Sequence, residues 1–264
     1  MNPAARELYA SIAVALARVS EARVSDRGIH EARKALKKAR AALRLLRPGL
    51  DPATYRTENG LLRDAGRALA PLREAKALLE ALRGLRLSDP DALPAASVQG
   101  LERALRAEKK RVASDRAAQQ AALATSIRLL KHSLARAERP DFAAMDDAPL
   151  AKGMRRIYRK GRRALAAARE SRSPEALHEW RKQSKYLLNA LETLHGARGG
   201  RRARRAERLA DRLGDDHDLD ALASRASRLK TLQAVIAGRR AKLQKQALRL
   251  GRKLYARKPK RFAR

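Results

Sequence analysis

Cysteine is absent from the 264-residue chain, and aromatic residues make up only 3% of it. The lack of cysteine excludes disulfides and thiol chemistry. No stretch of the sequence approaches the roughly 20 apolar residues of a membrane-spanning helix. The N-terminus, from Met1 to Leu16, lacks the basic region and the apolar run of a signal peptide. We therefore expect a cytoplasmic protein that does not contact the membrane.

Acidic residues are also few: 28 Asp and Glu stand against 62 Lys and Arg, a formal net charge of +34. Self-repulsion on this scale destabilises a compact chain, which points to an anionic partner. Proteins usually hold single-stranded nucleic acids by stacking bases on aromatic rings. Two Phe, five Tyr and one Trp offer little for that purpose. The composition therefore favours a phosphate polyanion without bases, namely inorganic polyphosphate, with nucleic acids and other polyanions as the alternative.

The remaining composition and the apolar spacing predict an all-α fold. Apolar residues make up 44% of the chain; most are Ala and Leu, which favour helix. Their spacing of three and four recurs along almost the whole sequence. Ser173 is predicted to cap a helix that has Pro174 at its first position. We expect about eight helices and a frayed basic tail over 257–264, with breaks at 48–52, 88–94, 139–149, 171–174 and 196–200.

Two segments of the sequence recur, which predicts an internal repeat. The pattern His-Glu-x-Arg-Lys occurs at 30–34 and again at 178–182, an offset of 148 residues. A second block, 69–78, aligns with 213–222 at an offset of 144 residues. We expect two pseudo-symmetric four-helix bundles, 1–139 and 140–256.

The helices that carry this pattern should each present a basic face opposite an apolar one, because residues three and four apart share a side of a helix. A third helix, just before the second copy, shows the same arrangement. Stacked like charges destabilise an isolated helix by a few tenths of a kcal/mol per pair, so these faces need an anionic partner or water. The predicted basic faces contain His30, Arg33, Lys34, Lys37, Arg40 and Arg44; Lys152, Arg155, Arg156, Arg159 and Arg163; and His178, Arg181, Lys182 and Lys185.

A solvated cationic surface is the plainer interpretation of such charge runs. The repetition of the same block at the start of both basic helices favours binding instead. His30 and His178 lie in register with the cations, so we expect them to contact the ligand. Protonation of these imidazoles below about pH 6.5 would add charge and strengthen binding in acid.

The paired His-x-x-Arg-Lys helices and the segment Leu213–Leu222 resemble the CHAD family of histidine-containing α-helical domains. The resemblance covers essentially the whole chain. It implies a polyphosphate-binding protein with a basic channel between two bundles, in some members associated with polyphosphate granules. It also adds His217 and its first-copy counterpart Arg73 to the predicted binding set. One departure is Lys76, which stands where the second copy has Asp220.

Enzymatic activity is not expected. The best candidate for a metal site is the acidic stretch from Asp215 to Asp220, which also contains His217. The first copy has Arg73 and Lys76 at the corresponding positions, which are unsuited to a cation. We expect these carboxylates to orient neighbouring Arg and Lys side chains and to begin a helix. The sequence therefore predicts no catalytic residue, metal or other cofactor, and a metal-dependent polyphosphate or triphosphate hydrolase is the less favoured alternative.

Overall fold

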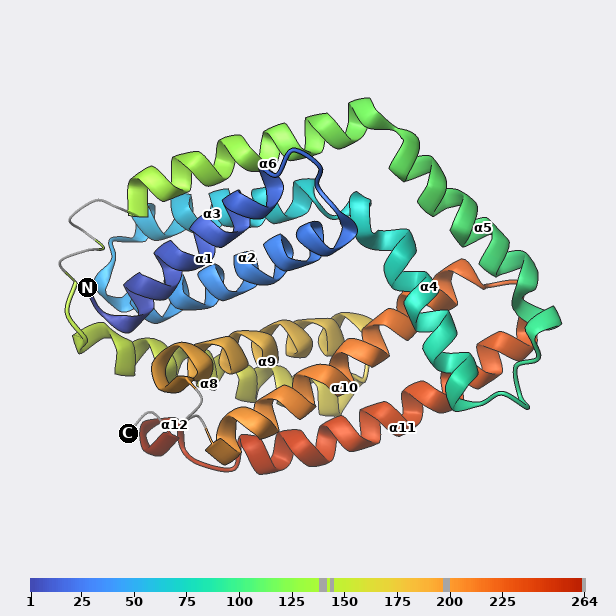
Figure 1. Cartoon of the computed structure of the whole chain (residues 1–264). Helices are drawn as coiled ribbons and strands as arrows, with labels where there is room; N and C mark the ends of the chain where they lie inside the picture. Colours follow the sequence, from blue (N-terminus) through green and yellow to red (C-terminus); the bar gives the residue numbers. More distant parts are fainter. Residues whose placement is uncertain (138–141, 143–144, 197–199, 263–264) are drawn as a thin grey trace.

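The computed structural model describes residues 1–137, 142, 145–196 and 200–262, and regular structure in this part of the chain is helical throughout (Figure 1). The first half contains α1 (Pro3–Val19), α2 (Asp26–Leu46), the 3-10 turn η1 (Arg47–Gly49), α3 (Pro52–Ala68), α4 (Pro71–Ser88), α5 (Ala95–Ser114) and α6 (Arg116–Ala137). The second half contains α8 (Ala148–Ser171), α9 (Pro174–His195), α10 (Gly200–Arg225), α11 (Lys230–Leu254) and α12 (Pro259–Phe262). The all-α prediction is confirmed.

Polar caps begin both basic helices, and the one at Ser173 was predicted from the sequence. The Ser25 hydroxyl accepts a hydrogen bond from the Gly28 backbone N–H at the start of α2. The Ser173 hydroxyl accepts one from the backbone N–H of Ala176, and Pro174 opens α9. Each cap satisfies an N–H that the first helical turn leaves unpaired. Residues 139–141 and 143–144 of the break at 139–149 lie outside the described residues, as do residues 197–199 of the turn at 196–200.

The described chain has more helices than predicted, because two long helical segments of the first half are interrupted. Pro71 lacks an N–H and cannot continue α3, so the chain turns at Leu69–Ala70 and restarts as α4. Asp115 separates α5 from α6, and its carboxylate accepts a hydrogen bond from the Ala118 backbone N–H. In the second half, α10 and α11 run through the corresponding places without interruption.

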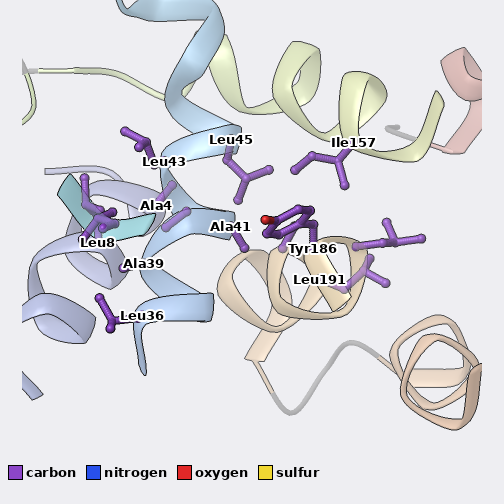
Figure 2. Close-up of a cluster of buried hydrophobic side chains, with 14 of the residues drawn as sticks. Ala4, Leu8, Leu36, Ala39, Ala41, Leu43, Leu45, Ile157, Tyr186 and Leu191 are labelled. Atoms are coloured by element: carbon purple, nitrogen blue, oxygen red, sulfur yellow. The ribbon is translucent and has the colours of Figure 1, made fainter. Parts of the chain in front are cut away.

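The two halves share an order of packing that is compatible with the predicted pseudo-symmetric pair. In the first half α1 packs on α2, and α3 and α4 pack on α6 and α5; in the second, α8 packs on α9, and α10 packs on α11. Helices α2 and α9 meet at the centre of the molecule (Figure 1). Figure 2 shows Ala41 and Leu45 of α2 next to Tyr186 of α9 and Ile157 of α8 within the large core.

A second, smaller core joins the halves at their other end. It contains Leu82 of α4, Val98 of α5, Leu222 of α10 and Ile236 of α11, all buried. Because both cores draw side chains from both halves, the two repeats pack into one body rather than as separate bundles.

The C-terminal segment is ordered where the sequence analysis expected a frayed tail. Residues 259–262 form α12, and the ring of Phe262 stacks on Tyr158 with centroids 3.9 Å apart. The Arg202 guanidinium donates a hydrogen bond to the Phe262 carbonyl oxygen at 3.2 Å. The prediction of a frayed tail is therefore wrong for these residues, while residues 263–264 lie outside the described part.

Candidate functional site

Helices α2 and α9 bring their basic faces together at the centre of the molecule. Coulombic repulsion from Arg181 of α9 reaches both Arg33 and Lys37 of α2, and Lys185 also acts on Lys37. Helices α4 and α10 add a basic side chain each, since Arg73 acts on Arg33, and His217 lies beside His178. We call this group the central cluster; it consists of His30, Arg33, Lys37, Arg73, His178, Arg181, Lys185 and His217.

Four cations of the central cluster have no carboxylate partner. Among the ion pairs formed by described residues, none includes Arg33, Lys37, Arg181 or Lys185. Arg33 donates only to the carbonyl oxygen of Gly66, at 3.0 Å. Within the described chain, Arg181 Nε is buried and has no hydrogen-bond partner. Such unpaired donors are expected where a ligand completes the site.

Burial and mutual repulsion hold the pKa of these cations below the ordinary values. Desolvation, followed by the charges of Arg181 and Arg33, lowers the pKa of Lys37 to about 8. The Lys37 side chain still reaches solvent, so a ligand has access to it. Desolvation also lowers the pKa of Arg33, Arg181 and Lys185. A bound polyanion would relieve this repulsion, which favours binding.

The histidines of the central cluster are neutral over a wider pH range than the sequence analysis assumed. His178 Nδ1 lies 3.4 Å from His217 Nδ1. Burial, then Arg181 and His178, lowers the pKa of His217 to about 4. Burial followed by nearby cations also lowers the pKa of His30 and His178. In the free protein any gain in binding from imidazole protonation therefore begins below the predicted pH of about 6.5.

The acidic stretch Asp215–Asp220 lies in the middle of α10, so the expectation that it begins a helix is wrong. Its predicted role in orienting cations is observed at Arg240 of α11. The Arg240 guanidinium pairs with Asp216 at 3.1 Å and with Asp220 at 2.6 Å. Within the described residues, no group of three or more His, Asp or Glu is arranged to hold a metal ion.

A second group of cations lies where the C-terminal part of α2 meets α8 and α9. The Arg44 guanidinium lies 3.7 Å above the ring of Tyr186, and Arg40 lies 5.9 Å from it. The charge of Arg47 acts on Arg156 and Lys160 of α8, and Arg47 itself covers the ring of Tyr55 at 4.3 Å. We call this group the tyrosine-backed cluster; it consists of Arg40, Arg44, Arg47, Arg156 and Lys160 with Tyr55 and Tyr186.

Some predicted site residues lie at the edges of the two clusters, where the charges of Lys34, Lys182 and Arg159 act on His30, His178 and Arg156. Lys34 lines a cavity of about 270 Å³ with Lys38, Glu7 and Glu192. Lys182 pairs with Glu179 at 2.6 Å. The other residues of the α8 stripe remain on that helix, half-buried or exposed, without a described contact to the central cluster: Lys152, Arg155, Arg159 and Arg163.

Residues that the sequence analysis did not assign are Arg47, Lys160 and the two tyrosines. Lys160 follows Arg156 by one helical turn, so its spacing was a usable signal. The tyrosines gave no such signal, because their contacts with arginines join different helices.

The whole arrangement matches a known domain. The sequence matches the CHAD domain family over residues 4–227. This chain belongs to the CHAD domain family. The fold is also similar to the crystal structure of the CHAD domain from the plant Ricinus communis, with a TM-score of 0.65 and 19% sequence identity, over 96% of this chain and 91% of that one. A search of curated protein sequences found no match.

Two further features of this CHAD domain bear on its surroundings. In the part of the chain that the structure describes, no helix is both long and apolar enough to cross a membrane. A cavity of about 680 Å³ lies between the α1–α2 turn and helices α4, α5 and α6. There Lys76 and Lys109 both pair with Asp26, so its cations are already neutralised in part.

Proposed function

We propose that this CHAD domain binds inorganic polyphosphate across the central cluster and does not hydrolyse it. The observation that carries the proposal is the meeting of Arg33 and Lys37 of α2 with Arg181 and Lys185 of α9, four cations without an ion pair among the described residues. Arg33 and Arg181 offer planar N–H groups to phosphate oxygens, and Lys37 and Lys185 offer ammonium groups. Polyphosphate has negative oxygens along its whole length, so one chain can satisfy cations from both helices.

The placement of the aromatic residues favours polyphosphate over single-stranded nucleic acid. Of the eight aromatic side chains, only Tyr9 on α1 is substantially exposed, at 37%. Trp180 and the remaining Tyr and Phe are at most 8% exposed. Base stacking needs exposed rings, and the central cluster contains none.

A four-site charge reversal at the central cluster tests the proposal. The variant Arg33→Glu/Lys37→Glu/Arg181→Glu/Lys185→Glu should lose binding of long-chain polyphosphate and of tripolyphosphate, measured by calorimetry, with helicity by circular dichroism unchanged. A matched control reverses four exposed cations elsewhere: Arg103, Lys110 and Arg111 on α5 and Lys245 on α11. Equal loss in both variants would reduce the proposal to non-specific attraction by net charge.

Competition and turnover separate the alternatives. Duplex DNA, added at equal phosphate concentration near physiological salt, should displace little polyphosphate. Binding of DNA through its phosphates alone weakens steeply as the salt concentration rises. Ready displacement by DNA would contradict the preferred ligand.

Phosphate release should stay at background with added Mg²⁺ or Mn²⁺. Steady phosphate release that Asp218→Asn abolishes would establish hydrolysis. Binding to polyphosphate granules in the cytoplasm is the cellular consequence we expect, and co-sedimentation with such particles would measure it.

A further inference from the structure

Three arginines of the tyrosine-backed cluster, Arg40, Arg44 and Arg47, lie over buried tyrosine rings. Tyr186 is 6% exposed and Tyr55 is 8% exposed, so each ring presents one face to a guanidinium rather than to solvent. Arg44 also donates to the Arg40 carbonyl oxygen at 2.8 Å. Side chains held in this way lose little conformational freedom when a ligand binds, which strengthens binding by guanidinium groups.

Close packing of α8 against α2 brings further cations to the same place. A Cβ atom at Gly153 would collide with the Leu45 backbone, so glycine is what permits this approach. The charge of Arg47 consequently acts on both Arg156 and Lys160, and the charge of Arg44 also acts on Lys160. Among the described residues, none of the five cations of the tyrosine-backed cluster forms an ion pair.

The corresponding positions of the other repeat carry no cations. At the repeat offset of 148, Arg40 and Arg44 correspond to Leu188 and Glu192 of α9. Glu192 lines the cavity of about 270 Å³ together with Glu7 of α1. Lys34 and Lys38 line the same cavity, so its two carboxylates and two cations balance. The tyrosine-backed cluster has five cations without an ion pair among the described residues, so the two ends of the central cluster differ in charge.

We propose that the polyanion extends from the central cluster on one side only, along α2 and onto α8 over the tyrosine-backed cluster. Lys37 and Arg40 are three residues apart on one face of α2, so the two clusters are continuous. The path from Arg33 to Arg47 follows α2 for about 21 Å at the helical rise of 1.5 Å per residue. A short phosphate chain fills the central cluster alone, whereas a long one also contacts the tyrosine-backed cluster. This inference rests on the proposed function.

Chain length is therefore the variable that tests the extension. The variant Arg44→Gln/Arg156→Gln should weaken binding of long-chain polyphosphate about tenfold or more, because it removes two charge-assisted contacts. Its affinity for tripolyphosphate should change less than about twofold. The matched control Arg6→Gln/Lys38→Gln removes two cations from α1 and from the opposite side of α2, and should leave both affinities unchanged.

The outcomes separate this inference from the proposed function. If the four-site central variant loses all binding while Arg44→Gln/Arg156→Gln binds long chains normally, only the one-sided extension is wrong. An equal loss in the control, or an equal loss for tripolyphosphate, would also overturn it. Lys160→Gln, a substitution at an exposed position of α8, provides an independent test and should weaken long-chain binding alone.

Discussion

Helices α2 and α9 begin with the same five-residue pattern but have different electrostatic surroundings. Around α9, the carboxylates of Asp211, Asp215 and Asp218 on α10 act on Lys185. Around α2, the charges that lower the pKa of Arg33 are those of two other arginines, Arg73 and Arg181. Both copies of the motif therefore carry the same cations. The charged side chains on the third helix of each repeat determine how strongly these cations are neutralised.

The third helices also explain a departure within the repeat. In the second half Asp220 of α10 pairs with Arg240 at 2.6 Å. In the first half Lys76 occupies the corresponding position on α4 and pairs with Asp26 of α2 at 3.2 Å. Where the second half has Asp220 and the first half has Lys76, the partner also changes, from an arginine to an aspartate. Each half therefore has an ion pair at this position of its third helix.

The two halves should respond alike to loss of a buried ion pair, which is the largest effect we predict. Glu58 of α3 is 2% exposed and pairs with Arg136 of α6; Asp216 of α10, also 2% exposed, pairs with Arg240 of α11. Removal of one partner leaves a buried charge, so Arg136→Met and Arg240→Met should each lower the free energy of unfolding by about 3 kcal/mol. Chemical denaturation of the free protein measures both.

An exposed ion pair gives the control. Arg225 pairs with Glu108 on the surface at 2.9 Å, so Arg225→Met should change the free energy of unfolding by less than about 1 kcal/mol. A neutral effect of Arg240→Met beside a large effect of Arg136→Met would show that the halves differ in their cores as well as at the site.

At the central cluster the halves should differ, because α10 already neutralises part of the charge of α9. The variant Arg33→Gln/Lys37→Gln should weaken polyphosphate binding about 100-fold, a free-energy loss of about 2.7 kcal/mol. The variant Arg181→Gln/Lys185→Gln should weaken it about tenfold, or about 1.4 kcal/mol. Calorimetry at fixed salt measures both affinities, and the reverse order would contradict the asymmetry.

The sequence predicted the parts of the fold and site that depend on local spacing. The cap at Ser173, the start of α9 and the stripes through Arg33, Lys37, Arg181 and Lys185 follow from residues within a few positions of one another. Such spacing places side chains on a face of their own helix. The resemblance to the CHAD family then implied that the two faces would line one channel.

The spacing of residues within one helix could not predict contacts between distant segments of the chain. The tyrosine-backed cluster depends on how closely α8 approaches α2 at Gly153, and α12 depends on Phe262 reaching Tyr158. The predicted breaks did not include the one before Pro71, where a residue without an N–H interrupts the helix. These features are set by packing across the sequence rather than by its periodicity.

Lys37 should dominate the pH dependence of binding, whereas Lys185 should not. The pKa of Lys37 in the free protein is about 8, and a polyanion stabilises its ammonium form and raises that pKa. Binding then takes up a proton, so affinity should fall as the pH rises above about 8, by at most about tenfold per pH unit. Lys37→Arg keeps the charge at all these pH values and should flatten the profile.

Lys185→Arg is the matched substitution in the other repeat. Asp211 and Asp218 favour the charged form of Lys185 and oppose the lowering of its pKa by burial. The profile of this variant between pH 7 and 9, at constant ionic strength, should therefore resemble that of the unmodified protein. A profile flattened by Lys185→Arg and not by Lys37→Arg would place the titrating group in the second half.

Asp218 is the source of the asymmetry that one substitution can remove. Its carboxylate acts on Lys37, Arg181 and Lys185 but forms no ion pair among the described residues, and burial raises its pKa. Because an unpaired carboxylate repels phosphate oxygens, Asp218→Asn should raise the affinity for polyphosphate about threefold. In the Asp218→Asn background, Arg181→Gln/Lys185→Gln should cause a larger loss of polyphosphate affinity, closer to the loss caused by Arg33→Gln/Lys37→Gln. A double-mutant cycle measures this change. A loss of affinity in Asp218→Asn would instead show that this carboxylate positions Arg181 for the ligand.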